Sequence, residues 1–112
     1  MSNLKKFEEY VIAPGETLLE LLETNCMTQL DLANKTGITK KTINEIIKGK
    51  APITPATALK LEYVFNIRAS FWNNLESDYR ESLERKKDMD SIIEDLRNIK
   101  DIEILEVNKH YE

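Results

Sequence analysis

Hydrophobic residues in this chain recur at helical spacing, three or four positions apart. After Pro14, a residue suited to a first helical turn, Leu18, Leu21 and Leu22 fall on one face. This pattern predicts a first helix over residues 15–25.

Two short helices are predicted next, over residues 29–36 and 40–48, each with a threonine as N-cap and a glycine at its end. The residues that begin and end them are Thr28, Gly37, Thr39 and Gly49. We expect their inward faces to carry Leu30, Leu32, Ala33, Ile43, Ile46 and Ile47.

A fourth helix is predicted to start at Thr54 and Pro55, a cap followed by a first-turn proline, and to end at Asn66. Ser70 is the expected cap of a fifth helix over residues 71–87. Apolar residues line one side of this fifth helix at spacings of four: Phe71, Leu75, Tyr79 and Leu83. Five helices and no clear strand define an all-α domain.

The C-terminal segment, residues 88–112, is less clear. Asp90 can cap a sixth helix whose apolar side carries Ile92, Ile93, Leu96 and Ile99. From Asp101 onward the pattern fits either a strand or a helix. These apolar residues need a partner surface, which could be the chain's own domain, a second protomer or a different protein; strand addition to a sheet edge is one possible mode.

The second and third helices have the spacing of a helix-turn-helix. Ala33, Gly37, Ile43 and Ile46 are separated by four, six and three residues. A small residue at Ala33 lets the next helix cross closely, Gly37 allows the tight turn, and the isoleucines, with Ile38, fill the space between helices.

Positive charge gathers on this motif although the protein is acidic, with 16 Lys and Arg against 20 Asp and Glu. Five lysines and one glutamate between Lys35 and Lys50 give a local net charge of +4. The third helix turns lysine, threonine and asparagine side chains outward. An exposed helix N-terminus of this kind suits phosphates and base edges, so we expect this surface to face DNA.

Composition argues against several other functions. The only histidine, His110, cannot by itself build a His-based metal site or catalytic triad, and no cofactor or catalytic set is expected, so the protein is not predicted to be an enzyme. Cys26 is the only cysteine and fits a reducing cytoplasm, where we expect it to be a buried small hydrophobe. No apolar run is long enough to span a membrane, and no signal peptide is recognisable.

Aromatic residues are interpreted first as packing residues. Phe71 is expected in the core, while Trp72 could be either core or a binding contact. Tyr63 and Tyr79 are expected to pack with hydrogen-bonded hydroxyls.

Residues 13–83, about two thirds of the chain, resemble the HigA-type antitoxins. These are plasmid maintenance antidote proteins within the Cro/lambda-repressor-like (XRE) helix-turn-helix family. The matching stretches are PGE (14–16), MTQLDLA (27–33), IIKGKAPIT (46–54), TALKLEYVF (57–65) and FWNNLESDY (71–79). The resemblance implies a five-helix, lambda-repressor-like DNA-binding domain that forms a homodimer, represses its own operon and binds a partner toxin. Such toxins are typically small ribonucleases that cleave mRNA on the ribosome.

The resemblance also assigns DNA-binding roles. Gln29 matches a glutamine that braces both a DNA phosphate and the recognition helix. Lys40 and Lys41 are the expected base-contacting residues, and Lys48 and Lys50 are expected to reach the backbone. The full predicted DNA-binding set is Gln29, Thr39, Lys40, Lys41, Thr42, Asn44, Lys48 and Lys50.

The expected organisation is an N-terminal arm over residues 1–12, the helix-turn-helix domain over 13–87, and a dimerisation or partner-binding extension over 88–112. The expected partners are double-stranded DNA with a palindromic operator, a cognate ribonuclease toxin and a second copy of the chain. Two alternatives remain open. One is an XRE regulator without a toxin, and the other is the DNA-binding domain of a larger ImmA/IrrE-type metallopeptidase regulator, although this chain has no HExxH motif.

Overall fold

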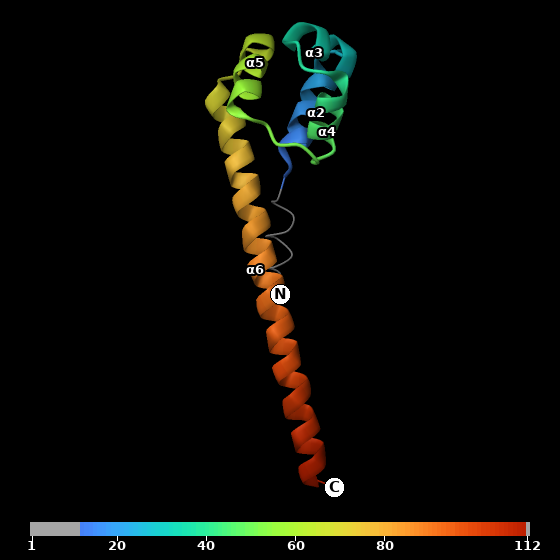
Figure 1. Ribbon diagram of the computed structural model, residues 1–112, viewed down its shortest axis with the longest axis vertical. Helices are drawn as coiled ribbons and strands as arrows, with labels where there is room; N and C mark the ends of the chain where they lie inside the picture. Colours follow the sequence, from blue (N-terminus) through green and yellow to red (C-terminus); the bar gives the residue numbers. More distant parts are fainter. Residues whose placement is uncertain (1–11, 112) are drawn as a thin grey trace. The chain divides into compact units, whose positions relative to one another are not determined.

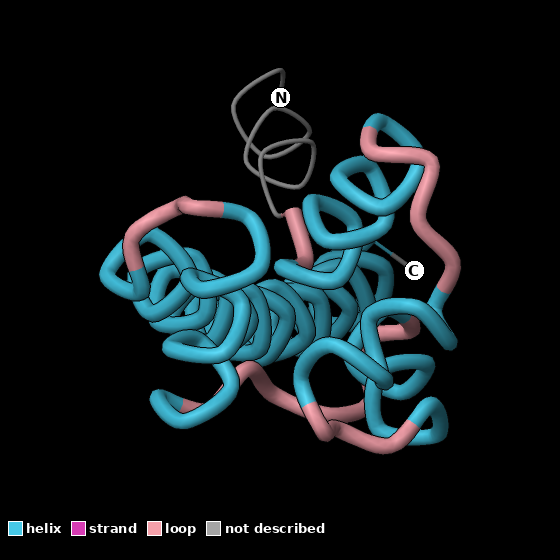
Figure 2. The backbone as a smooth tube through the Cα atoms, turned by 90° about the horizontal axis from the view of Figure 1, so that it is seen from above, coloured by secondary structure: helices cyan, strands magenta, loops and turns pink. Residues whose placement is uncertain are grey.

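The computed structural model describes the backbone of residues 12–111 and the side chains of residues 12–100. Its described part is helical with connecting loops and contains no strand (Figures 1 and 2). The helices are α2 (Pro14–Thr24), α3 (Gln29–Thr36), α4 (Lys40–Ile47), α5 (Pro55–Phe65) and α6 (Ala69–Tyr111). The all-α prediction is confirmed. The predicted N-terminal arm lies almost wholly outside the described residues.

Local capping explains where the short helices begin. The hydroxyl oxygens of Thr28, Thr39 and Thr54 accept hydrogen bonds from the backbone N–H groups of Asp31, Thr42 and Thr57, at 3.0, 3.1 and 3.2 Å. Each bond satisfies an N–H group that has no partner within its own helix. All three predicted caps are therefore confirmed.

Two helix ends depend on left-handed backbone conformations. Gly37 follows α3 with φ = 73°, and its N–H donates to the Ala33 carbonyl oxygen over 2.9 Å. Asn66 follows α5 with φ = 57°. Glycine and asparagine tolerate this region better than other residues. Both ends match the sequence prediction.

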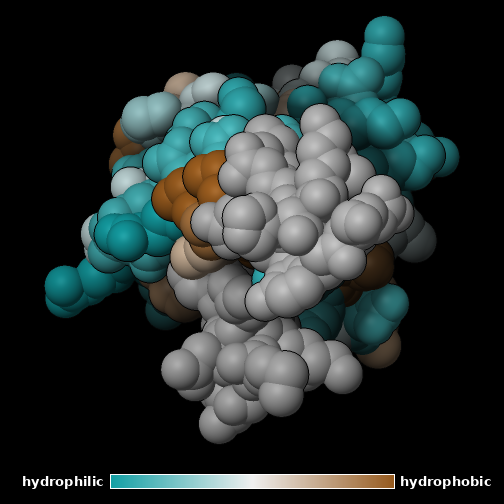
Figure 3. Space-filling view, turned by 90° about the horizontal axis from the view of Figure 1, so that it is seen from below, coloured by the Kyte–Doolittle hydropathy of each residue, from teal (hydrophilic) through white to brown (hydrophobic). Residues whose placement is uncertain are grey.

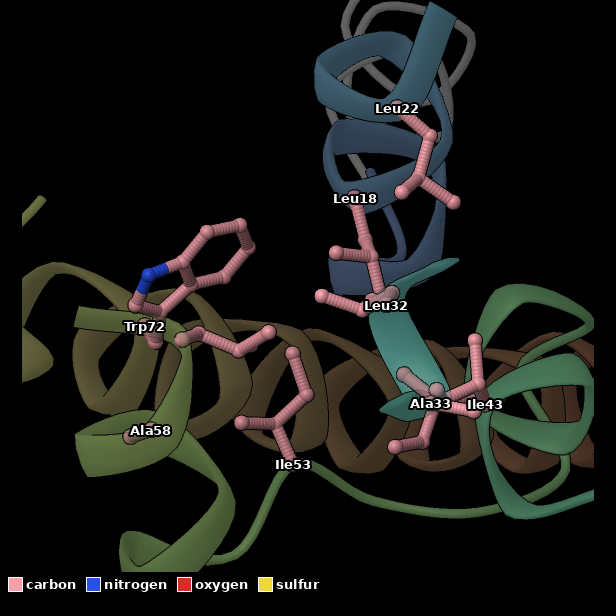
Figure 4. Close-up of a cluster of buried hydrophobic side chains, with 10 residues drawn as sticks. Leu18, Leu22, Leu32, Ala33, Ile43, Ile53, Ala58 and Trp72 are labelled. Carbon is pink, nitrogen blue, oxygen red and sulfur yellow. The ribbon is translucent and has the colours of Figure 1, made fainter. Parts of the chain in front are cut away.

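The chain divides into two compact units, one up to Glu81 and the other from Ser82 onward. The core of the first unit draws on every helix from α2 to α6 and on the loop before α5 (Figure 4). Its buried residues are Leu18, Leu22, Leu32, Ala33, Ile43, Ile46, Ile53, Ala58, Leu61 and Trp72. This core fixes α3 and α4 against α2.

Two residues expected to be buried face solvent because of helix phase. Leu30 is 54% exposed and Tyr63 is 83% exposed. Leu30 lies two residues before buried Leu32, and Tyr63 lies two residues after buried Leu61. Since two residues correspond to about 200° around a helix, each lies roughly opposite the buried face. The prediction that Leu30 turns inward and the expectation that Tyr63 is a packing residue are both wrong.

The start of α6 also corrects the prediction. Trp72 is fully buried, with its ring centroid 5.4 Å from that of Phe71 and 6.5 Å from that of Phe65, whereas Phe71 is 42% exposed. Trp72, and not Phe71, is therefore the core residue. The helix starts at Ala69, so Ser70 is not its N-cap. Instead, the Ala69 N–H donates to Oε1 of Glu62 on α5 over 2.9 Å.

The second unit belongs to the same helix, α6, which runs without a break to Tyr111. The separate sixth helix capped by Asp90 and the strand considered after Asp101 are both wrong. No glycine or proline occurs between residues 69 and 111 to stop the helix.

Cys26 is exposed, contrary to the expected buried position. It lies in the turn after α2 with φ = 51°, and its N–H donates to the Glu23 carbonyl oxygen over 3.1 Å. No helix in the described part of the chain is both long enough and apolar enough to cross a membrane.

Candidate nucleic-acid interface

The turn between α3 and α4 is held by side-chain and backbone hydrogen bonds. The Thr36 hydroxyl donates to the Leu32 carbonyl oxygen over 2.7 Å and accepts from the Ile38 N–H over 3.2 Å. Gly37 bends the chain between these two contacts. Thr36 is a structural residue of the motif that sequence reasoning missed; a threonine directly before the helix-ending glycine was the available signal.

Thr28 and Asp31 fix the beginning of α3 reciprocally. The Thr28 hydroxyl accepts from the Asp31 N–H, and the Thr28 N–H donates to the Asp31 carboxylate over 2.9 Å. This capping box pairs two backbone donors that the helix itself leaves unpaired. The Thr28 N–H, the Thr28 hydroxyl and the positive charge of Lys35 hold the pKa of Asp31 below its ordinary value of 3.8.

α3 and α4 are joined by a side-chain amide contact. Nδ2 of Asn44 donates to Oε1 of Gln29 over 3.2 Å, across a separation of 15 residues. Both side chains are half-buried. This contact uses one amide hydrogen and one carbonyl oxygen, so the pair retains further donors and an acceptor for a ligand. The contact between Gln29 and the third predicted helix, implied by the family resemblance, is present.

The N-terminal end of α4 presents polar and basic groups. Thr39 caps the helix, and its hydroxyl also donates to the Thr42 hydroxyl over 2.9 Å. Lys40 and Lys41 form the first turn and are exposed. Backbone N–H groups at a helix start carry partial positive charge. They therefore add to the attraction that the two lysines exert on anions.

Lys48 and Lys50 lie at the other end of α4, in the turn that follows it, and both are exposed. Lys48 is eight residues from Lys40, which corresponds to about 12 Å along a helix axis. The eight predicted residues therefore form one amide pair, one threonine pair and two separate lysine pairs. Lys35, in the last turn of α3, adds an exposed cation that the predicted set did not include.

Gly15 of α2 lies directly against the backbone at the end of α4. A Cβ atom at Gly15 would lie 2.6 Å from the Ile47 carbonyl oxygen and 2.7 Å from the Ile47 Cα, and closer still to the Ile46 carbonyl oxygen. These are backbone atoms, which cannot move aside as a side chain can. The close approach of α2 to the end of α4 therefore requires glycine at this position.

The carboxylates of Glu62 and Glu76 accept backbone hydrogen bonds from segments that follow the helix-turn-helix. Oε1 of Glu76 on α6 accepts from the Ile53 N–H over 2.8 Å, in the loop before α5. The other oxygen of Glu76 pairs with Arg80. Because Ile53 is a core residue, this contact fixes the loop that leaves α4. Neither Glu76 nor Glu62 was identified from the sequence as a structural residue.

Three solved structures resemble this chain over most of their own length. An addiction module antidote protein of the HigA family from Coxiella burnetii is 33% identical, with a TM-score of 0.66, over 74% of this chain and 91% of its own. The Pseudomonas aeruginosa antitoxin HigA, solved with the higBA promoter, is 29% identical, with a TM-score of 0.67, over 72% and 89%. Another Pseudomonas aeruginosa protein, solved with an 18-bp operator DNA, is 31% identical, with a TM-score of 0.63, over 65% and 80%.

The sequence model of the helix-turn-helix family matches residues 12–72, which include α2 to α5. No curated protein sequence matches the chain. The fold thus defines a helix-turn-helix protein of the XRE type. Within that class, the chain belongs to the HigA-type antitoxins. The family resemblance seen in the sequence is confirmed.

Proposed function

We propose that this protein is the antitoxin of a type II toxin–antitoxin module that binds an operator in its own promoter. The observation that carries the proposal is the exposed N-terminal end of α4 within a fold whose relatives were solved on promoter and operator DNA. In this proposal α4 is the recognition helix, and it enters the major groove with its N-terminal residues foremost.

The roles follow from where each group lies. In this proposal Lys40 and Lys41 contact base edges, and their position in the first turn of α4 supports that role. Lys48, about 12 Å further along the helix axis, and Lys50, in the turn after it, would contact phosphates on the far side of the groove. Gln29 holds Asn44 in position through the 3.2 Å contact and would also bind a phosphate.

A homodimer is part of the proposal. Two copies would place their recognition helices about 34 Å apart, one turn of DNA, on a palindromic operator. Occupation of that operator would repress the operon. Outside the motif the chain is acidic, and its overall net charge is −4. This acidic part would limit non-specific DNA binding.

DNA binding is tested with the protein's own upstream fragment and an unrelated fragment of equal length, across a salt series. Wild type should prefer the upstream fragment, and the affinity should fall steeply with salt. Lys40→Ala with Lys41→Ala should abolish that preference. Lys60→Ala with Lys87→Ala is the matched control, since it removes the same charge from exposed residues outside the motif. Equal binding to both fragments by the wild type would refute operator recognition.

Toxin neutralisation requires a separate experiment. The proposal is supported by the antidote-protein relatives of the chain. Co-expression with the product of an adjacent toxin-sized reading frame should restore growth that the toxin alone arrests. Lys40→Ala with Lys41→Ala should rescue growth as well as wild type when both proteins are produced from an unrelated promoter. If folded wild-type protein fails to restore growth, the protein does not neutralise this toxin, and the alternative of a regulator without a toxin would be favoured.

A further inference from the structure

Glu45 is the one acidic residue in the helix-turn-helix segment, residues 35–50, which otherwise carries five lysines. Hydrophilic side chains cover most of the described surface that Figure 3 shows, so an acid at the surface is ordinary by itself. Glu45 differs because it lies on the helix proposed to enter the major groove. A carboxylate there repels the phosphates that the lysines attract, so its value to a DNA-binding helix would have to come from another contact.

Helix phase puts Glu45 on the same side of α4 as two of the proposed DNA-binding lysines. It lies four residues after Lys41 and three before Lys48, and residues at these spacings are neighbours on a helix surface. The buried residues Ile43 and Ile46 face the core instead. Along the helix axis Glu45 is about 6 Å from Lys41, less than two base-pair steps of about 3.4 Å. The two side chains can therefore reach neighbouring base pairs.

The Glu45 side chain is half-buried, yet its carboxylate has no partner within the described part of the chain. In particular, it forms no ion pair with Lys41, Lys48 or Lys50, which would be the structural explanation for an acid at this position. Its backbone is held in place, because its carbonyl oxygen accepts from the N–H groups of Lys50 and Ala51 over 2.8 and 3.1 Å. The carboxylate is thus positioned by the fold and able to accept hydrogen bonds from a ligand.

The chemistry of a carboxylate selects among the bases. An ionised carboxylate only accepts hydrogen bonds. In the major groove the donors are the N4 amino group of cytosine and the N6 amino group of adenine, whereas guanine and thymine present acceptors. Adenine also presents the N7 acceptor beside its amino group, and that atom repels a carboxylate. Cytosine is therefore the base that suits Glu45 best.

We propose that Glu45 is a specificity-determining residue that accepts a hydrogen bond from the N4 amino group of a cytosine in each operator half-site. Lys41, on the same side of α4, would donate to a guanine at a neighbouring position. The proposal rests on operator binding, the proposed function, and adds which base the helix selects. Glu45 repels phosphates in any DNA but gains a hydrogen bond only at cytosine, so it disfavours unrelated DNA relative to the operator.

The base preference at each operator position tests the proposal. Each base pair of the half-site in the upstream fragment is replaced in turn, and fluorescence anisotropy measures the affinities of wild type, Glu45→Ala and Glu45→Gln. Replacing one C·G pair should weaken binding of wild type by at least about 5-fold and binding of Glu45→Ala by less than about 2-fold. Glu45→Gln should prefer adenine at that position, since an amide can accept from N6 and donate to N7.

Binding to the unrelated fragment gives a second result. Glu45→Ala should bind it at least about 3-fold more tightly than wild type, because a charge that repels phosphates is lost. Glu20→Ala removes the same charge from an exposed position of α2 and should change this affinity by less than about 2-fold, since salt screens distant charges. Circular dichroism and melting temperature of each variant show whether it is folded as the wild type is.

The outcomes separate this proposal from the proposed function. If wild type binds both fragments equally, operator recognition fails and the cytosine contact fails with it. If wild type prefers the upstream fragment but both Glu45 variants keep its base preferences, only the cytosine contact is overturned. Tighter binding of Glu45→Ala to both fragments by the same factor would also overturn it, since the carboxylate would then act only as a repulsive charge.

Discussion

Asn44 donates a hydrogen bond from its side-chain amide to Oε1 of Gln29 over 3.2 Å, and this contact joins the first residue of α3 to the middle of α4. The two residues are 15 positions apart in sequence, yet both are half-buried at the same place on the surface. The contact holds the side-chain amides of Gln29 and Asn44 in a fixed position relative to the exposed first turn of α4. It couples the two helices at the surface proposed to bind DNA.

A double-mutant cycle should reveal this coupling. Gln29→Ala and Asn44→Ala are each expected to weaken operator binding, and the double variant should be weaker than wild type by less than the sum of the single effects. The expected interaction free energy is about 0.5–3 kcal/mol, the range for residues in one hydrogen-bond network. Fluorescence anisotropy with the upstream fragment measures it. Strict additivity would show that the two amides act independently.

Gly15→Ala should destabilise the domain by about 1–3 kcal/mol, because the added methyl group meets the backbone of Ile46 and Ile47. Chemical denaturation measures the change in the free energy of unfolding. Glu20→Ala, at an exposed position of the same helix, should stay within about 0.5 kcal/mol of wild type. A Gly15→Ala protein as stable as wild type would mean that α2 and α4 separate at little cost.

Glu76→Ala should destabilise the domain by about 1–3 kcal/mol, since it leaves the Ile53 N–H without its acceptor in a partly buried site. Glu76→Gln should recover most of the loss, because the amide oxygen can still accept. Arg80→Ala removes the ion pair with Glu76 and the contact of the guanidinium with the Tyr79 ring, whose centroid lies 5.2 Å away, and should change stability by less than about 1 kcal/mol. Equal losses in Glu76→Ala and Arg80→Ala would assign the stability to the ion pair instead.

The acid side of the stability profile should report on Asp31. Its pKa in the folded protein lies below 3.8, chiefly because the Thr28 N–H donates to the carboxylate. A lowered pKa stabilises the folded state above the unfolded pKa, and that stabilisation is lost as pH falls through the folded pKa. The relevant window is therefore below about pH 4.

Carboxylate chemical shifts in an NMR titration would measure this pKa directly. Thr28→Ala should raise it toward 3.8, because the hydroxyl is lost, although the backbone donor remains. The same residue titrated in urea provides the unfolded reference. A native value at or above the urea value would contradict the capping-box geometry.

Sequence reasoning was reliable for most local features, although the caps predicted at Ser70 and Asp90 were wrong. The threonine caps and the ends at Gly37 and Asn66 depend on side chains within three or four residues, so the sequence displays them directly. It failed where packing selects between neighbours. Phe71 and Trp72 are adjacent and both aromatic, so the sequence does not show that the core takes the indole, which lies 6.5 Å from the Phe65 ring, and leaves Phe71 42% exposed.

Long-range contacts were the other source of error. Glu76 is 23 residues from Ile53, so no local pattern pairs them. The contact of Gln29 with α4, which reaches Asn44 15 residues away, was expected only from the family resemblance. The exposure of Lys40, Lys41, Lys48 and Lys50 could be predicted because charge and helix phase are visible in the sequence. Their division into two pairs at opposite ends of α4 follows from the helix bounds.

Trp72 is the only tryptophan of the chain, and its side chain is fully buried in the first unit. Its emission should therefore be blue-shifted in the native protein and should shift to the red when that core opens. The second unit contains no indole, so its helix contributes to far-ultraviolet circular dichroism but not to tryptophan emission. Melting curves recorded by both methods would thus separate loss of the DNA-binding domain from fraying of the C-terminal helix within a single sample.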